Sequence, residues 1–145
     1  MYIFDLDGTI ADLTHRYHYI DNDNPDWDAF YDACDKDEPI KDVINVLINL
    51  YKAGETIYIV SGRSDQCKVK TQKWLADNKI PYFVLYMRKK GDHRPDDEVK
   101  QEWLDHWLEN HKKEEIKGVF EDRKRVVDMW RKNGITCYQM KDGNY

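Results

Sequence analysis

Short apolar runs alternate with amphipathic segments along most of this chain. Residues 1–4 are apolar and end abruptly at Asp5, which is the pattern of a buried parallel strand. Further β-branched or apolar runs predict strands at 56–60, 82–86, 116–120 and 135–140. Apolar residues at helical spacing predict helices at 39–51, 64–75, 96–108 and 123–132. This alternation predicts an α/β fold with a parallel sheet and right-handed crossovers.

One segment interrupts the alternation. Residues 13–38 are rich in Asp, Asn, Tyr and Trp and show no long period. We interpret them as a small cap insertion with one short helix near residues 26–33. No repeat or linker divides the chain, so we predict a single domain, residues 1–145, that carries this insertion.

The composition is that of an ordinary globular protein, with 41% hydrophobic and 35% charged residues. The net charge of −5 is unevenly spread. Residues 1–50 contain 3 Lys+Arg and 12 Asp+Glu, whereas residues 51–145 contain 20 and 16. Such an acidic chain is a poor nonspecific binder of nucleic acid, but local arginines beside a metal can still hold a phosphate.

Membrane-span and signal-peptide patterns and the cysteines indicate the cellular location that we expect for the protein. No apolar run approaches the roughly 20 residues that span a bilayer, and the first residues lack the basic region of a signal peptide. We therefore expect a cytoplasmic protein with no membrane partner. The three cysteines are odd in number and widely spaced, which predicts reduced thiols rather than a disulfide framework or a zinc site.

Polar residues follow four of the predicted strands. Residues 5–9 (Asp-Leu-Asp-Gly-Thr) follow the first strand, residues 61–63 (Ser-Gly-Arg) the second, and residues 121–123 (Glu-Asp-Arg) the fourth. The third strand leads through a basic loop to Asp96 and Lys100. Because ligands bind beyond the carboxyl ends of parallel strands, we expect these four segments to meet at one edge of the sheet.

The residue types in these segments are suited to phosphoryl transfer. Carboxylates from the first and fourth segments supply the oxygen ligands that Mg2+ prefers. A carboxylate beside such a cation can attack phosphorus, because the metal and fixed cations offset the repulsion between two anions. Ser61 could donate a hydrogen bond to a phosphate oxygen, and Lys100 could neutralise the carboxylates and the phosphate together. Alternatively, Lys100 could be a solvated helix lysine.

The four segments together resemble the four motifs of the haloacid dehalogenase (HAD) superfamily. That resemblance implies a three-layer, Rossmann-like sheet with helices on both faces, a required Mg2+ and an aspartate nucleophile, here Asp5. It also implies that Asp7 is the general acid and base. The metal would be held by the side chains of Asp5 and Asp122 and by the backbone carbonyl of Asp7. Glu121 stands where the superfamily has Asp, so it could bind the metal directly or through water.

A narrower resemblance runs over nearly the whole chain and is weakest in residues 13–38. Residues 60–63, 91–100 and 121–123 are similar to the 3′-phosphatase domains of phage polynucleotide kinase-phosphatases. This implies that Arg16 and Arg63 bind phosphate or the sugar-phosphate backbone. We place the other expected substrate contacts at Thr9, Ser61, Gly62 and Asp96, the last of which would orient Lys100. No Gly-x-x-x-x-Gly-Lys-Ser/Thr loop occurs, so the kinase half of those enzymes is not implied.

Several other residues have two interpretations each. The aromatic residues of the insertion could stack on nucleobases or form a small core, and we favour a core for Trp27 and Phe30. Arg16 could be a surface residue. The basic side chains of the loop could contact backbone phosphates or simply be solvated: Arg88, Lys89, Lys90 and Arg94.

These expectations lead to a Mg2+-dependent phosphatase that removes 3′-phosphates from polynucleotide ends. Its partners would be nucleic acid 3′-phosphate ends or nucleotides. The insertion is too short to form a closed lid, so an open site would admit a strand end. Two other functions stay open: a nucleotidase or small-molecule phosphomonoesterase of the same superfamily, and a nucleic-acid-end-binding module without turnover.

Overall fold

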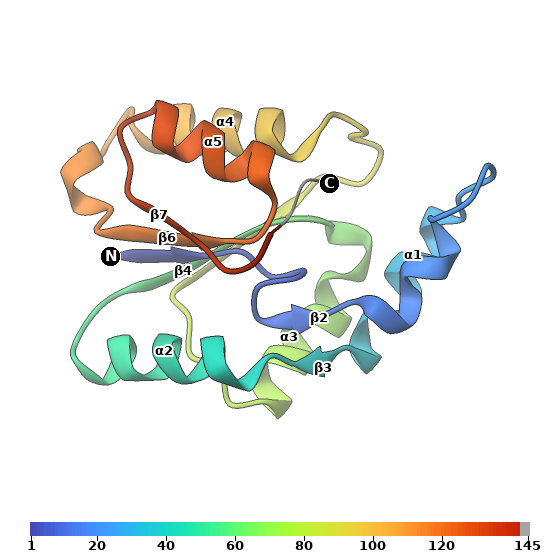
Figure 1. Ribbon diagram of the computed structural model, residues 1–145. Coiled ribbons are helices and arrows are strands. Elements are labelled where there is room, and N and C mark those ends of the chain that lie inside the picture. Colours follow the sequence, from blue (N-terminus) through green and yellow to red (C-terminus); the bar gives the residue numbers. More distant parts are fainter. Residues whose placement is uncertain (143–145) are drawn as a thin grey trace.

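A five-stranded parallel sheet forms the centre of the protein, whose computed structural model describes residues 1–142 (Figure 1). The strand order is β5-β4-β1-β6-β7, and every neighbouring pair is parallel. The bounds are β1 Tyr2–Phe4, β4 Ile57–Ser64, β5 Val84–Arg88, β6 Gly118–Glu121 and β7 Cys137–Gln139. The predicted α/β fold is confirmed, and β1 at its centre places Asp5 at the middle of the carboxyl edge.

Helices cover both faces of this sheet. In Figure 1, α4 and α5 lie above it and α2 and α3 lie below it. Successive side chains of a strand point to opposite faces, so β1 serves both cores. Ile3 packs into the cluster beneath α4 and α5, and Phe4 packs into the cluster above α2 and α3. The helix bounds are α2 Lys41–Lys52, α3 Lys68–Asp77, α4 Asp96–Trp107 and α5 Lys124–Lys132.

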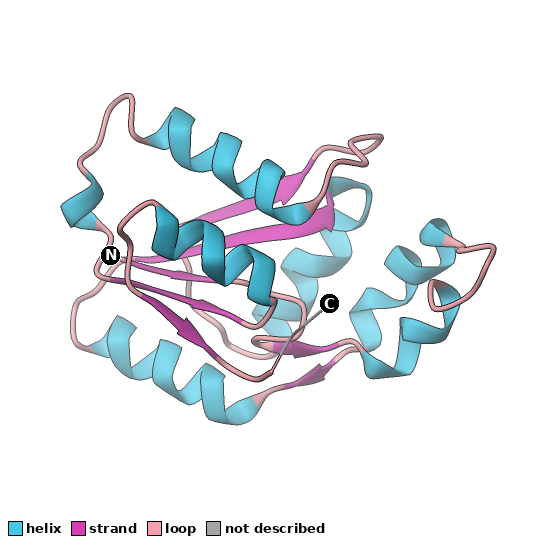
Figure 2. Cartoon of the chain, turned by 45° about the horizontal axis from the view of Figure 1, so that its top comes forward, coloured by secondary structure: helices cyan, strands magenta, loops and turns pink. Residues whose placement is uncertain are grey.

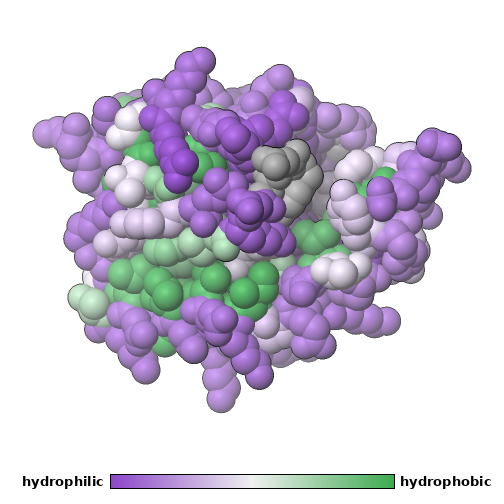
Figure 3. All heavy atoms as spheres, viewed as in Figure 1, coloured by the Kyte–Doolittle hydropathy of each residue, from purple (hydrophilic) through white to green (hydrophobic). Residues whose placement is uncertain are grey.

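The surface agrees with this three-layer packing. Figure 3 shows hydrophilic residues over most of the visible face and apolar residues gathered between the sheet and α2. Cys34, Cys67 and Cys137 are buried thiols. Within residues 1–142, no helix combines the length and the apolar character that crossing a membrane would require.

The insertion begins and ends in a small antiparallel ribbon, β2 Ala11–Asp12 with β3 Glu38–Pro39. Beyond the ribbon it stands at the end of the sheet toward which the strands run (Figure 2). The predicted short helix is present as α1 Trp27–Asp32. Two 3-10 helices flank it, η1 Thr14–Tyr19 and η2 Ala33–Lys36. These were not predicted, because a 3-10 helix of this length is too short to show a period.

One boundary prediction was wrong in a way that matters for the site. β4 continues through Ser61, Gly62 and Arg63 to Ser64, and its pairing with β5 shifts register between Ser61 and Ser64. The predicted start of the helix at residue 96 is confirmed, because Asp96 is the first residue of α4 and Pro95 is its N-cap. The Asp96 carboxylate is bound by arginines, as described below. The remaining short elements are η3 Asp65–Cys67 and η4 Lys113–Glu115.

Candidate active site

A buried lysine links carboxylates from two strand ends. Lys100 Nζ donates to Asp5 Oδ1 and to Glu121 Oε2, each at 2.7 Å. Asp5 follows β1, Glu121 ends β6, and Lys100 lies in the first turns of α4. Asp5, Glu121 and Asp122 each offer one carboxylate oxygen within 4.8 Å of the others. The structure therefore brings together residues that lie 95 positions apart in the chain.

The charges in this cluster are unbalanced. Burial raises the pKa of Asp5 to about 6, even though Lys100 opposes the shift. Burial and the charge of Asp5 raise the pKa of Glu121 well above its usual range. Burial alone would lower the pKa of Lys100, but the two carboxylates raise it, so Lys100 stays cationic. Three buried carboxylates supply oxygen ligands, and such a set fits a hard divalent cation such as Mg2+.

Glu121 and Asp122 differ in how their oxygens are used. Glu121 Oε2 accepts from Lys100, and Oε1 accepts from the backbone N–H groups of Asp122, at 3.1 Å, and Arg123, at 3.4 Å. Both oxygens of Glu121 thus already accept hydrogen bonds, and Oε2 holds Lys100. Thr9 Oγ1 donates to Asp122 Oδ1 at 3.5 Å, and Thr9 is fully buried. Thr9 thus lies behind a carboxylate instead of at the substrate contact we expected.

Replacing Gly8 with alanine should disturb this cluster directly. Gly8 has a φ of +82°, and a Cβ there would lie 2.2 Å from Asp122 Oδ2. Since the methyl group and the carboxylate cannot share that space, Gly8→Ala should raise the Mg2+ concentration for half-maximal activity about tenfold or more. Gly54→Ala is the matched control, because Gly54 has a φ of +91° and open space around it. Equal Mg2+ requirements in the two variants would show that only backbone strain matters.

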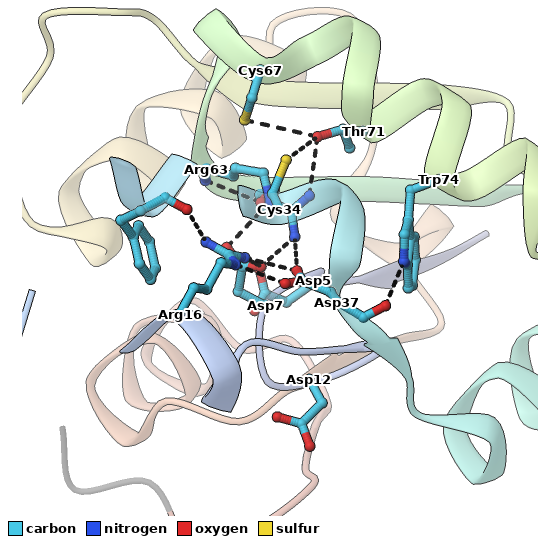
Figure 4. Close-up of polar contacts among 12 residues, drawn as sticks. Asp5, Asp7, Asp12, Arg16, Cys34, Asp37, Arg63, Cys67, Thr71 and Trp74 are labelled. Atoms are coloured by element: carbon cyan, nitrogen blue, oxygen red, sulfur yellow. Dashed lines mark hydrogen bonds and ion pairs between the residues drawn. The ribbon is translucent and has the colours of Figure 1, made fainter. Parts of the chain in front are cut away.

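A second buried network surrounds Asp7 (Figure 4). Arg16 donates to Asp7 Oδ1 at 2.8 Å, and Arg63 donates to the same oxygen at 2.5 Å. Both arginines also bind Asp37: Arg16 at 2.7 and 2.8 Å, and Arg63 at 2.9 Å. Arg63 also donates to Thr71 Oγ1 at 3.0 Å. Two arginines are therefore held between Asp7, from the segment after β1, and Asp37, near the end of the insertion.

These contacts set the ionisation of Asp7. Burial would raise the pKa of Asp7, but the charges of Arg63 and Arg16 lower it to about 2. Burial would lower the pKa of each arginine, yet Asp7 and Asp37 raise both values. Asp7 is therefore a carboxylate at neutral pH.

Sequence reasoning missed Asp37. It lies in a charged run, residues 35–38, that resembles a solvated turn, yet its side chain is fully buried. His15 Nε2 also lies 2.7 Å from Asp37 Oδ1, and the Asp37 backbone carbonyl accepts from the Trp74 indole at 2.8 Å. The residue type alone gave no signal, because an aspartate among charged neighbours is usually solvated.

The position of Arg16 and the hydrogen-bond partners of Asp96 differ from those predicted. Arg16 is fully buried, with its guanidinium 4.2 Å from the Phe30 ring centre, and it is not among the described residues that line the pocket. It therefore lies behind Asp7. Asp96 binds Arg88 and, at 2.8 Å, Arg123, so its hydrogen bonds go to arginines instead of Lys100. A Cβ on Gly62 would lie 2.3 Å from Asp96 Oδ1, so glycine is required for this approach.

Arg88 and Arg94, the two arginines of the basic loop before α4, make most of their contacts within the protein. Arg88 is buried and donates to the carbonyls of Gly62, at 2.7 Å, Asp92, at 3.1 Å, and Arg94. Arg94 itself pairs with Asp92 and Glu102. These arginines hold the loop together, contrary to the phosphate contacts considered for them. Lys89 and Lys90 are exposed and stay candidates.

One pocket of about 360 Å3 connects the two networks with the insertion. Its inner wall carries most of the predicted site: Asp5, Asp7, Ser61, Gly62, Arg63, Asp96, Glu121 and Asp122. Ser61 Oγ accepts from the backbone N–H of Arg63 at 3.0 Å, which leaves its own proton for another acceptor. The outer wall comes from the insertion and from the loop before α4. A tetrahedral anion placed between these walls would meet Arg63 and the carboxylate cluster whose Asp5 and Glu121 are bound by Lys100.

Comparisons with known proteins agree with this geometry. A family model described as the polynucleotide kinase PNKP phosphatase domain matches residues 1–145. A chain in a structure of the Pnkp1/Rnl/Hen1 complex is 29% identical, with a TM-score of 0.81, over 99% of this chain and 46% of that chain. A chain in a structure of the Pnkp1/Rnl/Hen1 RNA repair complex is also 29% identical, with a TM-score of 0.80. That match covers 99% of this chain and 43% of the other chain. This chain thus spans less than half the length of either relative.

The fold is also found in more distant proteins. A HAD family enzyme from Bacteroides thetaiotaomicron, in complex with magnesium and inorganic phosphate, is 13% identical, with a TM-score of 0.54. The match covers 99% of this chain and 95% of that enzyme. This likeness concerns the fold alone.

Proposed function

Because the chain belongs to the family of polynucleotide kinase PNKP phosphatase domains, we propose that it removes 3′-phosphates from polynucleotide ends through an aspartyl-phosphate on Asp5. A HAD-type phosphatase, and so phosphoric monoester hydrolysis, follows from the family. Mg2+ dependence and the 3′ position belong to the proposal. The observation that carries it is the contact of Lys100 with both Asp5 and Glu121, at 2.7 Å, beside the arginine-bound Asp7.

The first chemical step forms a bond between a carboxylate oxygen of Asp5 and phosphorus. Lys100 fixes Asp5 Oδ1, so the other carboxylate oxygen can face the phosphate. The P–O3′ bond breaks, and Asp7 donates a proton to the departing 3′ oxygen. Mg2+, when bound by Asp5, Asp122 and the Asp7 carbonyl, would supply the positive charge that offsets repulsion between carboxylate and phosphate.

The second step hydrolyses the aspartyl-phosphate. Asp7 takes a proton from a water molecule, whose oxygen bonds to phosphorus as the Asp5–phosphorus bond breaks. Inorganic phosphate leaves and Asp5 is restored. With a pKa of about 2, Asp7 is ionised before this step but is a weak base, so a bound phosphate that shares the charge of Arg63 must first raise its pKa. For the first step Asp7 must carry a proton, and a bound phosphate that shares the charge of Arg63 would make that easier.

The insertion is consistent with a strand end as substrate. It stands beyond the carboxyl edge of the sheet, and its short elements border the pocket without enclosing it as a separate domain would. The two relatives come from complexes whose printed titles name Pnkp1, and one is called an RNA repair complex. We therefore propose nucleic acid ends, RNA among them, as the substrate class.

A substrate panel tests the proposal. We expect Mg2+-dependent phosphate release from 3′-phosphorylated oligonucleotides, little from 5′-phosphorylated ones, and none with a chelator present. Preferred hydrolysis of free nucleotides would instead identify a nucleotidase. Binding of the oligonucleotide without phosphate release would identify an end-binding module and overturn the enzymatic proposal.

A further inference from the structure

The part of the pocket wall that the insertion forms is largely apolar and aromatic, which the phosphate chemistry does not require. Besides Asp28, the insertion residues that line the pocket are Leu13, Tyr17, Ile20, Trp27, Phe30 and Tyr31. Facing it is the loop before α4, which contributes the exposed residues Lys89 and His93. One end of the pocket is thus charged and the other is apolar, as in a nucleotide.

Trp27 is the most exposed large apolar side chain of this wall. Its side chain remains 45% exposed although it lines the pocket, whereas Phe30 is only 6% exposed. We expected both residues to form a small core, and Trp27 does pack against Phe30 but leaves nearly half of its own surface exposed. Phe30 is the core residue, because it is buried against Arg16. A large aromatic surface left open beside a catalytic cluster is available to a ligand.

The Trp27 ring is also held in place. It packs edge-on against Phe30, with ring centres 5.6 Å apart, and lies 5.9 Å from Tyr31. Trp27 begins α1, and the Asp26 side chain caps that helix by accepting from Ala29 N–H at 3.0 Å. A ring fixed in this way offers a stacking surface whose ordering cost is already met in the free protein.

From this arrangement we infer that Trp27 stacks on the base of the terminal nucleotide whose 3′-phosphate lies at Asp5. The inference rests on the proposed function and names the part of the substrate that the apolar wall recognises. The pocket volume of about 360 Å3 is near the lower end of small-ligand sites, so it suits one nucleotide and not a duplex. Every base has a stacking face, so Trp27 favours a base over no base, with little preference among the four.

The experiment compares two ends that differ only in the terminal base. One 3′-phosphorylated oligonucleotide carries a normal terminal nucleotide, and the other carries an abasic one. In Trp27→Ala we expect KM for the normal end to rise about 5- to 100-fold, with little change for the abasic end. Trp27→Phe should retain most of the affinity. Tyr19→Ala is the matched control, since Tyr19 is an insertion aromatic outside the described pocket lining.

The possible outcomes separate the inference from the proposed function. Equal rises in KM for both ends would mean that Trp27 only supports the insertion, which overturns the stacking role. An unchanged KM for both ends overturns it too. Circular dichroism and turnover of the abasic end establish that the variant is folded. If the wild-type protein hydrolyses neither oligonucleotide but does hydrolyse a small phosphomonoester, the proposed substrate is wrong, which is a different result.

Discussion

Asp5→Asn should abolish phosphate release while the protein remains folded. The amide cannot attack phosphorus, so we expect a loss of more than about 1,000-fold in kcat. The fold should survive because an amide oxygen can still accept from Lys100, whose second partner Glu121 is untouched. Phosphate release by single-turnover kinetics and thermal unfolding of the same sample measure the two effects.

The matched control for this prediction is Asp21→Asn. Asp21 is an exposed aspartate of the insertion and is not among the described residues that line the pocket. Its replacement removes the same charge from the same chain, and activity should stay within about twofold, as for most surface substitutions. Substantial activity in Asp5→Asn would contradict covalent catalysis at this residue, whatever the control shows.

Asp37→Asn should be among the most destabilising single substitutions in the insertion. Asp37 is fully buried and accepts from both Arg16 and Arg63, so its loss leaves two buried guanidinium groups with Asp7 as their remaining carboxylate partner. Removing one partner of a buried ion pair costs about 3–5 kcal/mol in free energy of unfolding. Misplacement of Arg63 should also lower kcat about 10- to 100-fold.

Asp35→Asn is the control, because Asp35 lies two positions away, in the 3-10 helix η2 that ends just before Asp37, and is exposed. Both variants lose one negative charge, so a difference between their urea unfolding midpoints reports the effect of losing the buried carboxylate. If Asp37→Asn unfolds at the same urea concentration as Asp35→Asn, the network around Asp7 contributes nothing to stability. The assignment of Asp37 as the residue that positions Arg63 would then be lost.

The parallel sheet and its catalytic edge could be predicted from the chain alone. Apolar runs that end abruptly in Asp5 and in Glu121 mark strands whose carboxyl ends carry chemistry, and helical spacing marks the crossovers. These patterns are local, and the handedness of the crossovers leaves few ways to arrange them. The meeting of Asp5, Lys100 and Asp122 follows from that topology.

The partners of buried charges could not be predicted in this way. Asp37 has the sequence surroundings of a solvated turn, yet it accepts hydrogen bonds from two buried arginines. Arg88 has the surroundings of a phosphate-binding loop, yet it donates to backbone carbonyls, including that of Gly62. Which anion neutralises which cation depends on distances between segments that are far apart in the chain. The sequence by itself determined the parallel sheet and the polar residues that follow its strands, because both follow from local pattern. Only the tertiary structure decided the position of each charge and the exposure of Trp27, because burial is a property of the packed molecule.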